Sequence, residues 1–153
     1  MHNVLTNKVQ AVYKKILVAL ENSESDSSLL PHVTELAQRL GSELLLVHVA
    51  DGWVARNFDQ LKLAESDEMK VDRAYLNEVA GQLRVSGLTV STHLALGDPP
   101  AEILKTAALE RCDLIAMTSH GHRLIGDLIY GSTIHEVRHR TTIPVLLVRA
   151  EKK

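Results

Sequence analysis

The sequence predicts an α/β domain in which five parallel strands form a sheet with helices on both faces. Two observations lead to this expectation. Short apolar runs, typical of strands buried on both faces, occur at five places along the chain. Segments with apolar residues at helical spacing lie between these runs. Such alternation of strands and helices favours right-handed βαβ crossovers, which make the strands parallel.

The first strand and helix occupy the N-terminal part of the chain. Residues 16–20 are an apolar run, and a serine-rich turn follows it. Apolar residues then recur at helical spacing until Gly41, which we expect to end the helix in the left-handed conformation. Pro31 lacks an N–H and is best tolerated in a first turn, so we place the helix N-cap at Ser27 or Ser28.

The middle of the chain contains the second and third strands. Residues 44–49 form the second buried run, and residues 88–96 alternate enough to indicate an edge strand. A long helix lies between them and ends near Gly87. Four residues at helical spacing mark the expected buried face of this helix: Val71, Tyr75, Val79 and Leu83.

The next helix begins at a strong signal, because Asp98 is a good capping residue and Pro99 fits the first helical position. Its expected buried stripe consists of Ile103, Leu104, Ala107 and Ala108. The fourth strand is the apolar run that starts at Leu114 and ends near Thr118. Residues 144–149 form the fifth strand.

Composition limits the location and the partners of the protein. The 153 residues carry 17 basic and 19 acidic side chains, a net charge of −2, so we expect no binding to nucleic acid or to anionic membranes. No apolar run approaches the length of a membrane span. The single cysteine, Cys112, fits a cytoplasmic protein. We predict a flexible N-terminal extension at residues 1–13 and a single domain at 14–150.

Residues 113–133 are the strongest candidate for a ligand site. The fourth strand ends in a polar loop that contains Gly121, and Gly131 and Ser132 follow after a nine-residue spacer. Glycine lets a ligand approach the backbone closely. Ser132 fits the N-cap of the following helix, where unpaired N–H groups and the helix dipole attract anions. Spacing of this kind also occurs in α/β domains without a ligand, so a purely structural loop is the alternative.

This spacing resembles the nucleotide-binding signature of the universal stress protein family, Gly-x2-Gly-x9-Gly-Ser after a strand that ends in Met. Gly121, Gly131 and Ser132 fit the signature, whereas Thr118 takes the place of its first glycine. Four further segments extend the resemblance over most of the chain: Lys15-Ile-Leu-Val-Ala-Leu-Glu, Leu45-Leu-Val-His-Val, Leu96-Gly-Asp-Pro and Pro144-Val-Leu-Leu-Val-Arg.

The resemblance implies a Rossmann-like, adenine nucleotide alpha hydrolase-like fold with strand order 3-2-1-4-5. In this order the topological switch point lies between the first and fourth strands, and ligands bind beyond the carboxyl ends of the strands at such a point. The resemblance also implies ATP as the ligand, alone or with Mg²⁺ or Mn²⁺. The implied nucleotide-binding residues are Ala19, Glu21, Val49, Met117, Thr118, Gly121, His122, Arg123, Gly131, Ser132 and Thr133.

Two of these residues depart from the family pattern. Thr118 adds a branched side chain where the backbone would approach the ligand, which would either crowd the nucleotide or offer it a hydroxyl. Glu21 stands where the family usually has aspartate, and its extra methylene keeps the charge but moves it. Simple packing at strand ends is the alternative for Ala19, Val49 and their neighbours, and His122 and Arg123 fit a solvated loop equally well.

Other sequence motifs argue against a dedicated enzyme. Residues 135–139 read His-Glu-x-x-His, the pattern of zinc proteases. A catalytic zinc needs a third protein ligand, and Glu151 is the only acid in the fourteen residues after His139. We therefore assign no metal site and expect both histidines to be solvated. The chain also lacks a Gly-x4-Gly-Lys-Ser/Thr phosphate loop, a dinucleotide fingerprint and a Gly-x-Ser-x-Gly elbow.

The fifth strand predicts a homodimer. In the order 3-2-1-4-5, residues 144–149 lie at a sheet edge, and Pro144 and Arg149 protect only the two ends of this edge. Antiparallel pairing with a second copy about a two-fold axis would cover the edge and stop further growth. The alternative is a monomer whose N-terminal extension covers the same edge.

Taken with these observations, the resemblance implies an ATP-binding regulatory or protective module in a stress response. No general base is visible, so any ATP hydrolysis should be slow and the chain should not be a dedicated enzyme. One alternative is a nucleotide-free dimeric scaffold of the same fold that acts through protein contacts. A more remote alternative is a nucleotidyl-transfer or slow ATP-hydrolysing enzyme.

Overall fold

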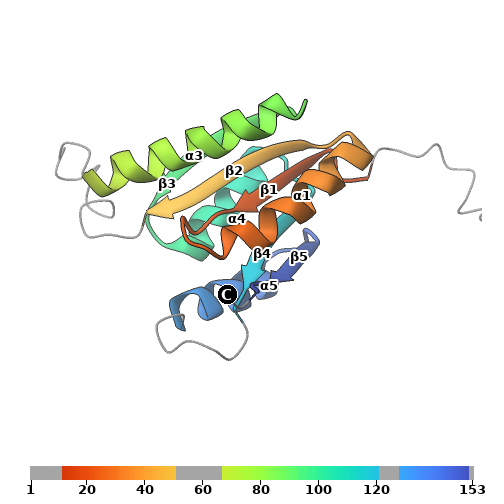
Figure 1. The fold of residues 1–153 in the computed structure, drawn as a ribbon. Coiled ribbons are helices and arrows are strands. Elements are labelled where there is room, and N and C mark those ends of the chain that lie inside the picture. The colour runs from red at the N-terminus through yellow and green to blue at the C-terminus, as the bar shows by residue number, and fades with distance from the viewer. Residues whose placement is uncertain (1–11, 51–66, 121–127, 152–153) are drawn as a thin grey trace, which may run out of the picture.

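The computed structural model describes residues 12–50, 67–120 and 128–151, the last segment with side chains from Thr133 onward. A five-stranded parallel sheet with the order β3-β2-β1-β4-β5 confirms the predicted fold class and strand order (Figure 1). The elements are β1 (Lys15–Ala19), α1 (Asp26–Leu40), β2 (Glu43–Ala50), α3 (Asp67–Val85), β3 (Val90–Leu96), α4 (Pro99–Leu109), β4 (Leu114–Ser119), α5 (Leu128–Arg140) and β5 (Val145–Arg149).

Helices cover both faces of the sheet, α1 and α3 on one face and α4 and α5 on the other (Figure 1). The strand register explains how the layers form. Leu17 of β1 lies opposite Leu45 of β2 and Ile115 of β4, and these three side chains pack with Ile103 of α4 and Val137 of α5. The strand residues directly before and after Leu17, Leu45 and Ile115 point to the face covered by α1 and α3, because successive side chains of a strand point to opposite faces. Both faces are therefore apolar, as the continuous apolar runs predict.

The start of α1 differs from the prediction. The helix begins at Asp26 with Ser25 at the N-cap, so Pro31 lies inside the helix instead of in its first turn. The Asp26 carboxylate accepts hydrogen bonds from the N–H groups of Glu21 and Asn22, both at 2.9 Å, and these contacts draw the helix start toward the end of β1. The end of the helix is as predicted, since Gly41 has φ 70° in the left-handed region.

Two residues of the predicted helix stripes are exposed. Val71 of α3 is 62% exposed, and Asp72 is buried in its place. Ala108 of α4 is also exposed, whereas Thr106 is buried. Val79 and Leu83 are buried as predicted, and the rest of the buried face of α3 consists of Met69, Asp72, Leu76 and Ala80. The predicted start of α4 is confirmed, because Asp98 accepts a hydrogen bond from the Ala101 N–H.

Helix α5 begins earlier than the sequence predicts. Its first residue is Leu128, so Gly131 and Ser132 are the fourth and fifth residues of the helix and Ser132 is not its N-cap. The first four N–H groups of an α-helix have no partner within the helix. Three of them belong to residues 128–130, the first three of the helix, and the fourth belongs to the N-cap, so neither Gly131 nor Ser132 supplies one.

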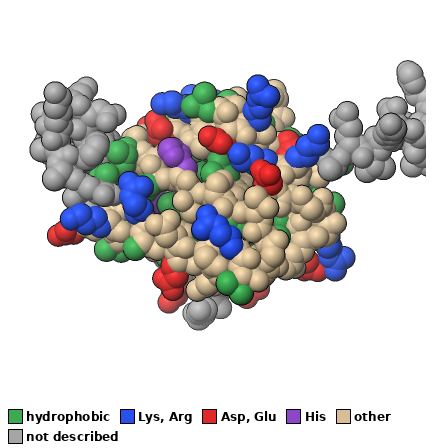
Figure 2. Space-filling model, turned by 90° about the horizontal axis from the view of Figure 1, so that it is seen from above, with side chains coloured by type: hydrophobic (Ala, Val, Ile, Leu, Met, Phe, Trp, Pro, Cys, Tyr) green, Lys and Arg blue, Asp and Glu red, His purple; other side chains and the backbone are tan. Residues whose placement is uncertain are grey.

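The two edge strands of the sheet are β3 and β5. This agrees with the edge-like pattern of residues 88–96 and with the edge position predicted for 144–149. On the face that Figure 2 shows, positive and negative side chains of the described residues are interspersed. None of the helices within the described ranges is both long and apolar enough to cross a membrane.

Candidate nucleotide site

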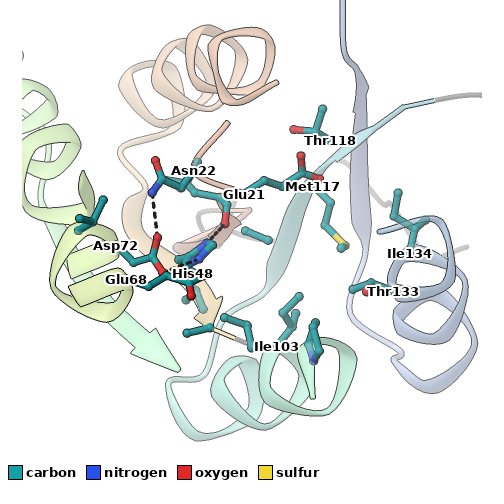
Figure 3. Close-up of a pocket in the computed structure, with 17 residues that line it drawn as sticks. Glu21, Asn22, His48, Glu68, Asp72, Ile103, Met117, Thr118, Thr133 and Ile134 are labelled. Atoms are coloured by element: carbon teal, nitrogen blue, oxygen red, sulfur yellow. Dashed lines mark hydrogen bonds and ion pairs between the residues drawn. The ribbon is translucent and has the colours of Figure 1, made fainter. Parts of the chain in front are cut away.

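A cavity of about 660 Å³ lies at the carboxyl ends of β1, β2 and β4 (Figure 3). It lies at the switch point between β1 and β4, where open α/β sheets bind their ligands. Its volume is in the range of small-molecule sites. Strand ends and the helices α3, α4 and α5 supply its apolar lining, which includes Ala19, Val49, Val71, Pro99, Ile103, Met117 and Ile134.

Six residues of the predicted site line this cavity: Ala19, Glu21, Val49, Met117, Thr118 and Thr133. Gly131 and Ser132 belong to the first turns of α5. The predicted loop residues Gly121, His122 and Arg123 lie outside the described residues. The sequence reasoning missed the polar wall of the cavity, which is formed by Asn22, His48, Glu68 and Asp72.

Glu21 follows β1, and its carboxylate is held by two other side chains. Nε2 of His120 lies 2.9 Å from Oε1 and 2.8 Å from Oε2 of this carboxylate. Because a carboxylate accepts only, this ring nitrogen carries a proton. The Ser25 hydroxyl donates to Oε2 at 2.5 Å. This hydrogen bond joins the ends of β1 and β4 across the switch point, at a separation of 99 residues in the sequence.

Asp26 connects the end of β1 to α1 and α3. Its side chain is 1% exposed, and its two oxygens accept the N–H groups of Glu21 and Asn22 and the Tyr75 hydroxyl at 2.6 Å. Three donors therefore surround one buried carboxylate, as the burial of a charge requires. The residue fixes the backbone at Glu21 without lining the cavity itself.

A second polar group holds α3 against the cavity. The Asn22 amide donates to Oδ1 of Asp72 at 2.8 Å, and Nε2 of His48 lies 3.3 Å from Oδ2 (Figure 3). The other ring nitrogen of His48 faces the Leu20 carbonyl at 2.8 Å. One signal in the sequence could have identified this group. Asp72 is a charged residue on the helix stripe that also contains Met69 and Leu76, both buried, and a charged residue at a buried position needs a partner.

The side chain of Thr118 does not share a face with Met117. Met117 packs in the layer of α4 and α5, whereas Ala116 belongs to the opposite layer, so alternation places the Thr118 side chain on the α1 side. In Figure 3 the two side chains leave β4 in different directions. Thr118 is 2% exposed, and its hydroxyl has no hydrogen-bond partner within the described part of the chain.

Replacing Thr118 with valine is expected to raise the free energy of unfolding by about 1 kcal/mol, because a buried hydroxyl without a partner is destabilising. Valine keeps the shape of threonine and removes only the polar atom. The matched control is Thr34→Val, since the Thr34 hydroxyl donates to the Leu30 carbonyl at 2.7 Å. Urea unfolding of both variants tests the difference. A larger loss of stability for Thr118→Val than for the control would contradict the assignment.

Alkaline pH is expected to destabilise the fold through Tyr75 and Cys112. Burial, reinforced by the hydrogen bond to Asp26, raises the pKa of Tyr75 above its ordinary value of 10.0. Burial also raises the pKa of Cys112 from 9.0 to about 11. Both groups keep their protons in the folded state at pH values where the unfolded chain releases them, so stability falls as the pH rises above these ordinary values.

Urea unfolding at a series of pH values measures this slope. Cys112→Ala should flatten the stability curve between pH 9 and pH 11. Tyr75→Phe should flatten it above pH 10. Slopes that stay the same as in the parent protein would show that neither group carries the alkaline loss.

The two histidines of the His-Glu-x-x-His pattern lie on an exposed face of α5. The rings of His135 and His139 contact each other edge to face, with centroids 4.3 Å apart, and Glu136 pairs with Arg140 at 3.5 Å. Within the described ranges no three histidine, cysteine or acidic side chains come together as a metal site would require. The geometry therefore gives no support to zinc chemistry at these residues.

Comparison with known proteins places this geometry in a family. The model of the universal stress protein family matches residues 12–149. Universal stress protein MJ0577 of Methanocaldococcus jannaschii is 28% identical over 92% of this chain and 98% of its own length. The solved structure of MJ0577 has a TM-score of 0.73 at 27% identity and covers 93% of this chain and 99% of that chain.

Two more distant solved structures share the fold. A universal stress protein from Archaeoglobus fulgidus in complex with dAMP has a TM-score of 0.65 at 20% identity, over 90% of this chain and 98% of that chain. A universal stress protein in complex with cAMP has a TM-score of 0.67 at 17% identity, over 92% of this chain and 99% of that chain. With a family model that spans nearly all of its length, the chain belongs to the universal stress protein family.

Proposed function

We propose that this chain binds ATP in the cavity at the switch point and acts as a regulatory or protective module in a stress response. The observation that carries the proposal is the combination of an apolar slot at the carboxyl ends of β1, β2 and β4 with the held Glu21 carboxylate beside it. The slot suits a flat base, and the carboxylate suits a sugar hydroxyl.

The phosphates would lie toward the start of α5. The N–H groups of residues 128–130 have no partners within the helix, and the helix dipole adds to their attraction for anions. The predicted contacts of Gly121, His122 and Arg123 belong to this part of the proposal. A Mg²⁺ or Mn²⁺ ion would be held mainly by phosphates and water, because the described residues bring no three metal-ligating side chains together.

The proposed role is binding, not dedicated catalysis. The buried ionisable side chains around the cavity already contact one another, Glu21 with His120 at 2.8 Å and Asp72 with His48 at 3.3 Å. Hydrolysis of ATP would need a group that positions and activates water. Two proteins of this fold were solved with dAMP and cAMP, which supports an adenine nucleotide as the ligand class.

The first test is direct measurement of ATP binding. We expect a dissociation constant in the micromolar range, about −8 kcal/mol, by titration calorimetry. Ala19→Phe would fill the apolar slot and is expected to weaken binding by a factor of about 30 or more, since Ala19 lines the cavity. The control Val85→Phe lies at an 89% exposed position at the end of α3. No heat at millimolar ATP would favour the nucleotide-free scaffold.

We also propose that the protein is a cytoplasmic homodimer that pairs through β5. The edge strand has an exposed apolar middle, where Leu147 is 37% exposed. Pairing of two such edges about a two-fold axis would satisfy their backbone groups and leave no further edge to extend. Its test is given in the Discussion.

A further inference from the structure

We propose that this site recognises only one of the two ribose hydroxyls of its nucleotide, because Ser25 and His120 occupy the rest of the Glu21 carboxylate. The inference rests on the proposed function and narrows its ligand class. The second ribose hydroxyl, which the site does not recognise, contributes nothing to binding. One of the two monodeoxy forms of ATP, the one that lacks this hydroxyl, therefore binds as well as ATP itself.

The first argument is the hydrogen-bonding capacity of the carboxylate. Each carboxylate oxygen offers about two acceptor positions. Oε2 of Glu21 accepts from Ser25 at 2.5 Å, has the His120 ring nitrogen at 2.8 Å and receives a longer contact from the Ser23 hydroxyl at 3.4 Å, so its positions are used. Oε1 has one contact, to the same His120 nitrogen at 2.9 Å. Within the described residues, Oε1 therefore keeps one position for a ligand hydroxyl.

The second argument is the behaviour of Ser25. Serine at an N-cap normally accepts a hydrogen bond from the first turn of the helix, a contribution of about 1 kcal/mol. Ser25 is the N-cap of α1, yet its side chain makes no capping bond and donates to Glu21 instead. The Ser23 hydroxyl lies 2.6 Å from the Ser25 hydroxyl and 3.4 Å from Oε2 of Glu21, to which it also donates. This chain of hydroxyls fixes Oε2 in place.

The third argument is that Glu21 cannot easily turn to offer both oxygens. Its backbone N–H is held by the buried Asp26, and its side chain is held by Ser25 and His120, which come from different elements. Recognition of two adjacent hydroxyls by one carboxylate uses both oxygens. A rearrangement that exposes Oε2 would break the bond to Ser25, which lies 9% exposed beneath it. Ser25 and His120 are therefore positioning residues that set the sugar specificity.

Calorimetry with ATP, 2′-deoxy-ATP, 3′-deoxy-ATP and 2′,3′-dideoxy-ATP tests the inference in the full-length protein. One monodeoxy nucleotide should bind within a factor of about two of ATP, and the other should bind about tenfold more weakly. The dideoxy nucleotide should match the weaker of the two. Equal losses for both monodeoxy nucleotides, or no loss for either, would overturn the inference. No binding of ATP itself would instead refute the proposed function.

A variant pair provides the second readout. Removing both hydroxyls in Ser23→Ala with Ser25→Ala opens Oε2, so both monodeoxy nucleotides should then bind more weakly than ATP. Ser27→Ala is the matched control, because the Ser27 hydroxyl donates to the Glu24 carbonyl and does not touch Glu21. The control should keep the pattern of the parent protein. An unchanged pattern in the double variant, with circular dichroism showing it folded, would contradict the role of Ser25.

Discussion

Replacing Asp26 with alanine is expected to lower the free energy of unfolding by about 3–5 kcal/mol. The carboxylate is 1% exposed and accepts three hydrogen bonds, from the N–H groups of Glu21 and Asn22 and from the Tyr75 hydroxyl. Alanine would leave all three donors without this acceptor in a buried region. Such groups are destabilising because they have already lost their contacts with water.

Two variants make this measurement specific. Asp26→Asn keeps the size of the side chain and one acceptor oxygen, so it should lower the free energy of unfolding by less than Asp26→Ala does. Asp98→Ala removes an exposed carboxylate that caps α4 through a single N–H at 3.3 Å, and its loss should be about 1 kcal/mol. Urea unfolding should be carried out at one protein concentration, because dimerisation would couple stability to concentration. Equal losses for Asp26→Ala and Asp98→Ala would refute the central position of Asp26.

Replacing Leu147 with proline is expected to convert the proposed dimer into a monomer. The Ile115 N–H donates to the Pro144 carbonyl, and the Ala150 N–H donates to the Ser119 carbonyl. These two bonds show that the even-numbered residues of β5 face β4. Along a strand, the backbone N–H and C=O groups of successive residues point alternately to the two neighbouring sides. The N–H of Leu147, an odd-numbered residue, therefore points to the open edge of the sheet. Proline removes a donor needed by a second copy and leaves the bonds to β4 in place.

Light scattering after size exclusion measures the outcome. The parent protein should have about twice the mass of one 16.9 kDa chain, and Leu147→Pro should have the mass of one chain. Leu147→Ala keeps the N–H and should remain dimeric, which separates the backbone donor from the side chain. A parent protein that runs as a single chain would rule out the dimer and would favour an edge covered by the N-terminal extension.

The sequence predicts the framework because its signals are local. Apolar runs give the five strands, and Gly41 and Asp98 mark helix boundaries through the chemistry of the residue itself. Burial repeats along a strand or helix with a fixed period, so it leaves a pattern in neighbouring residues. The strand order came from the family resemblance instead, since a single sequence carries no signal for which strands pair.

Only the tertiary structure shows why a carboxylate lies on the buried face of α3 and what holds the start of α1. The apolar spacing placed Val71 on that face, whereas Asp72 lies there between Met69 and Leu76, bonded to Asn22 and in contact with His48, and Val71 is exposed. The start of α1 moves to Asp26 because that carboxylate also serves Tyr75, 49 residues away. No periodicity records such a contact.

The candidate site was also predicted in part from the sequence and determined in part only by the tertiary structure. The resemblance pointed to Ala19, Glu21 and Met117, and all three line the cavity. The sequence did not identify the partners of Glu21, although His120 lies only two residues beyond the predicted Thr118. A hydrogen bond between residues 99 apart requires that β1 and β4 be neighbours with a particular register. Local residue types determine where the chain forms strands and turns, whereas only the packed sheet determines which side chains meet at its edge.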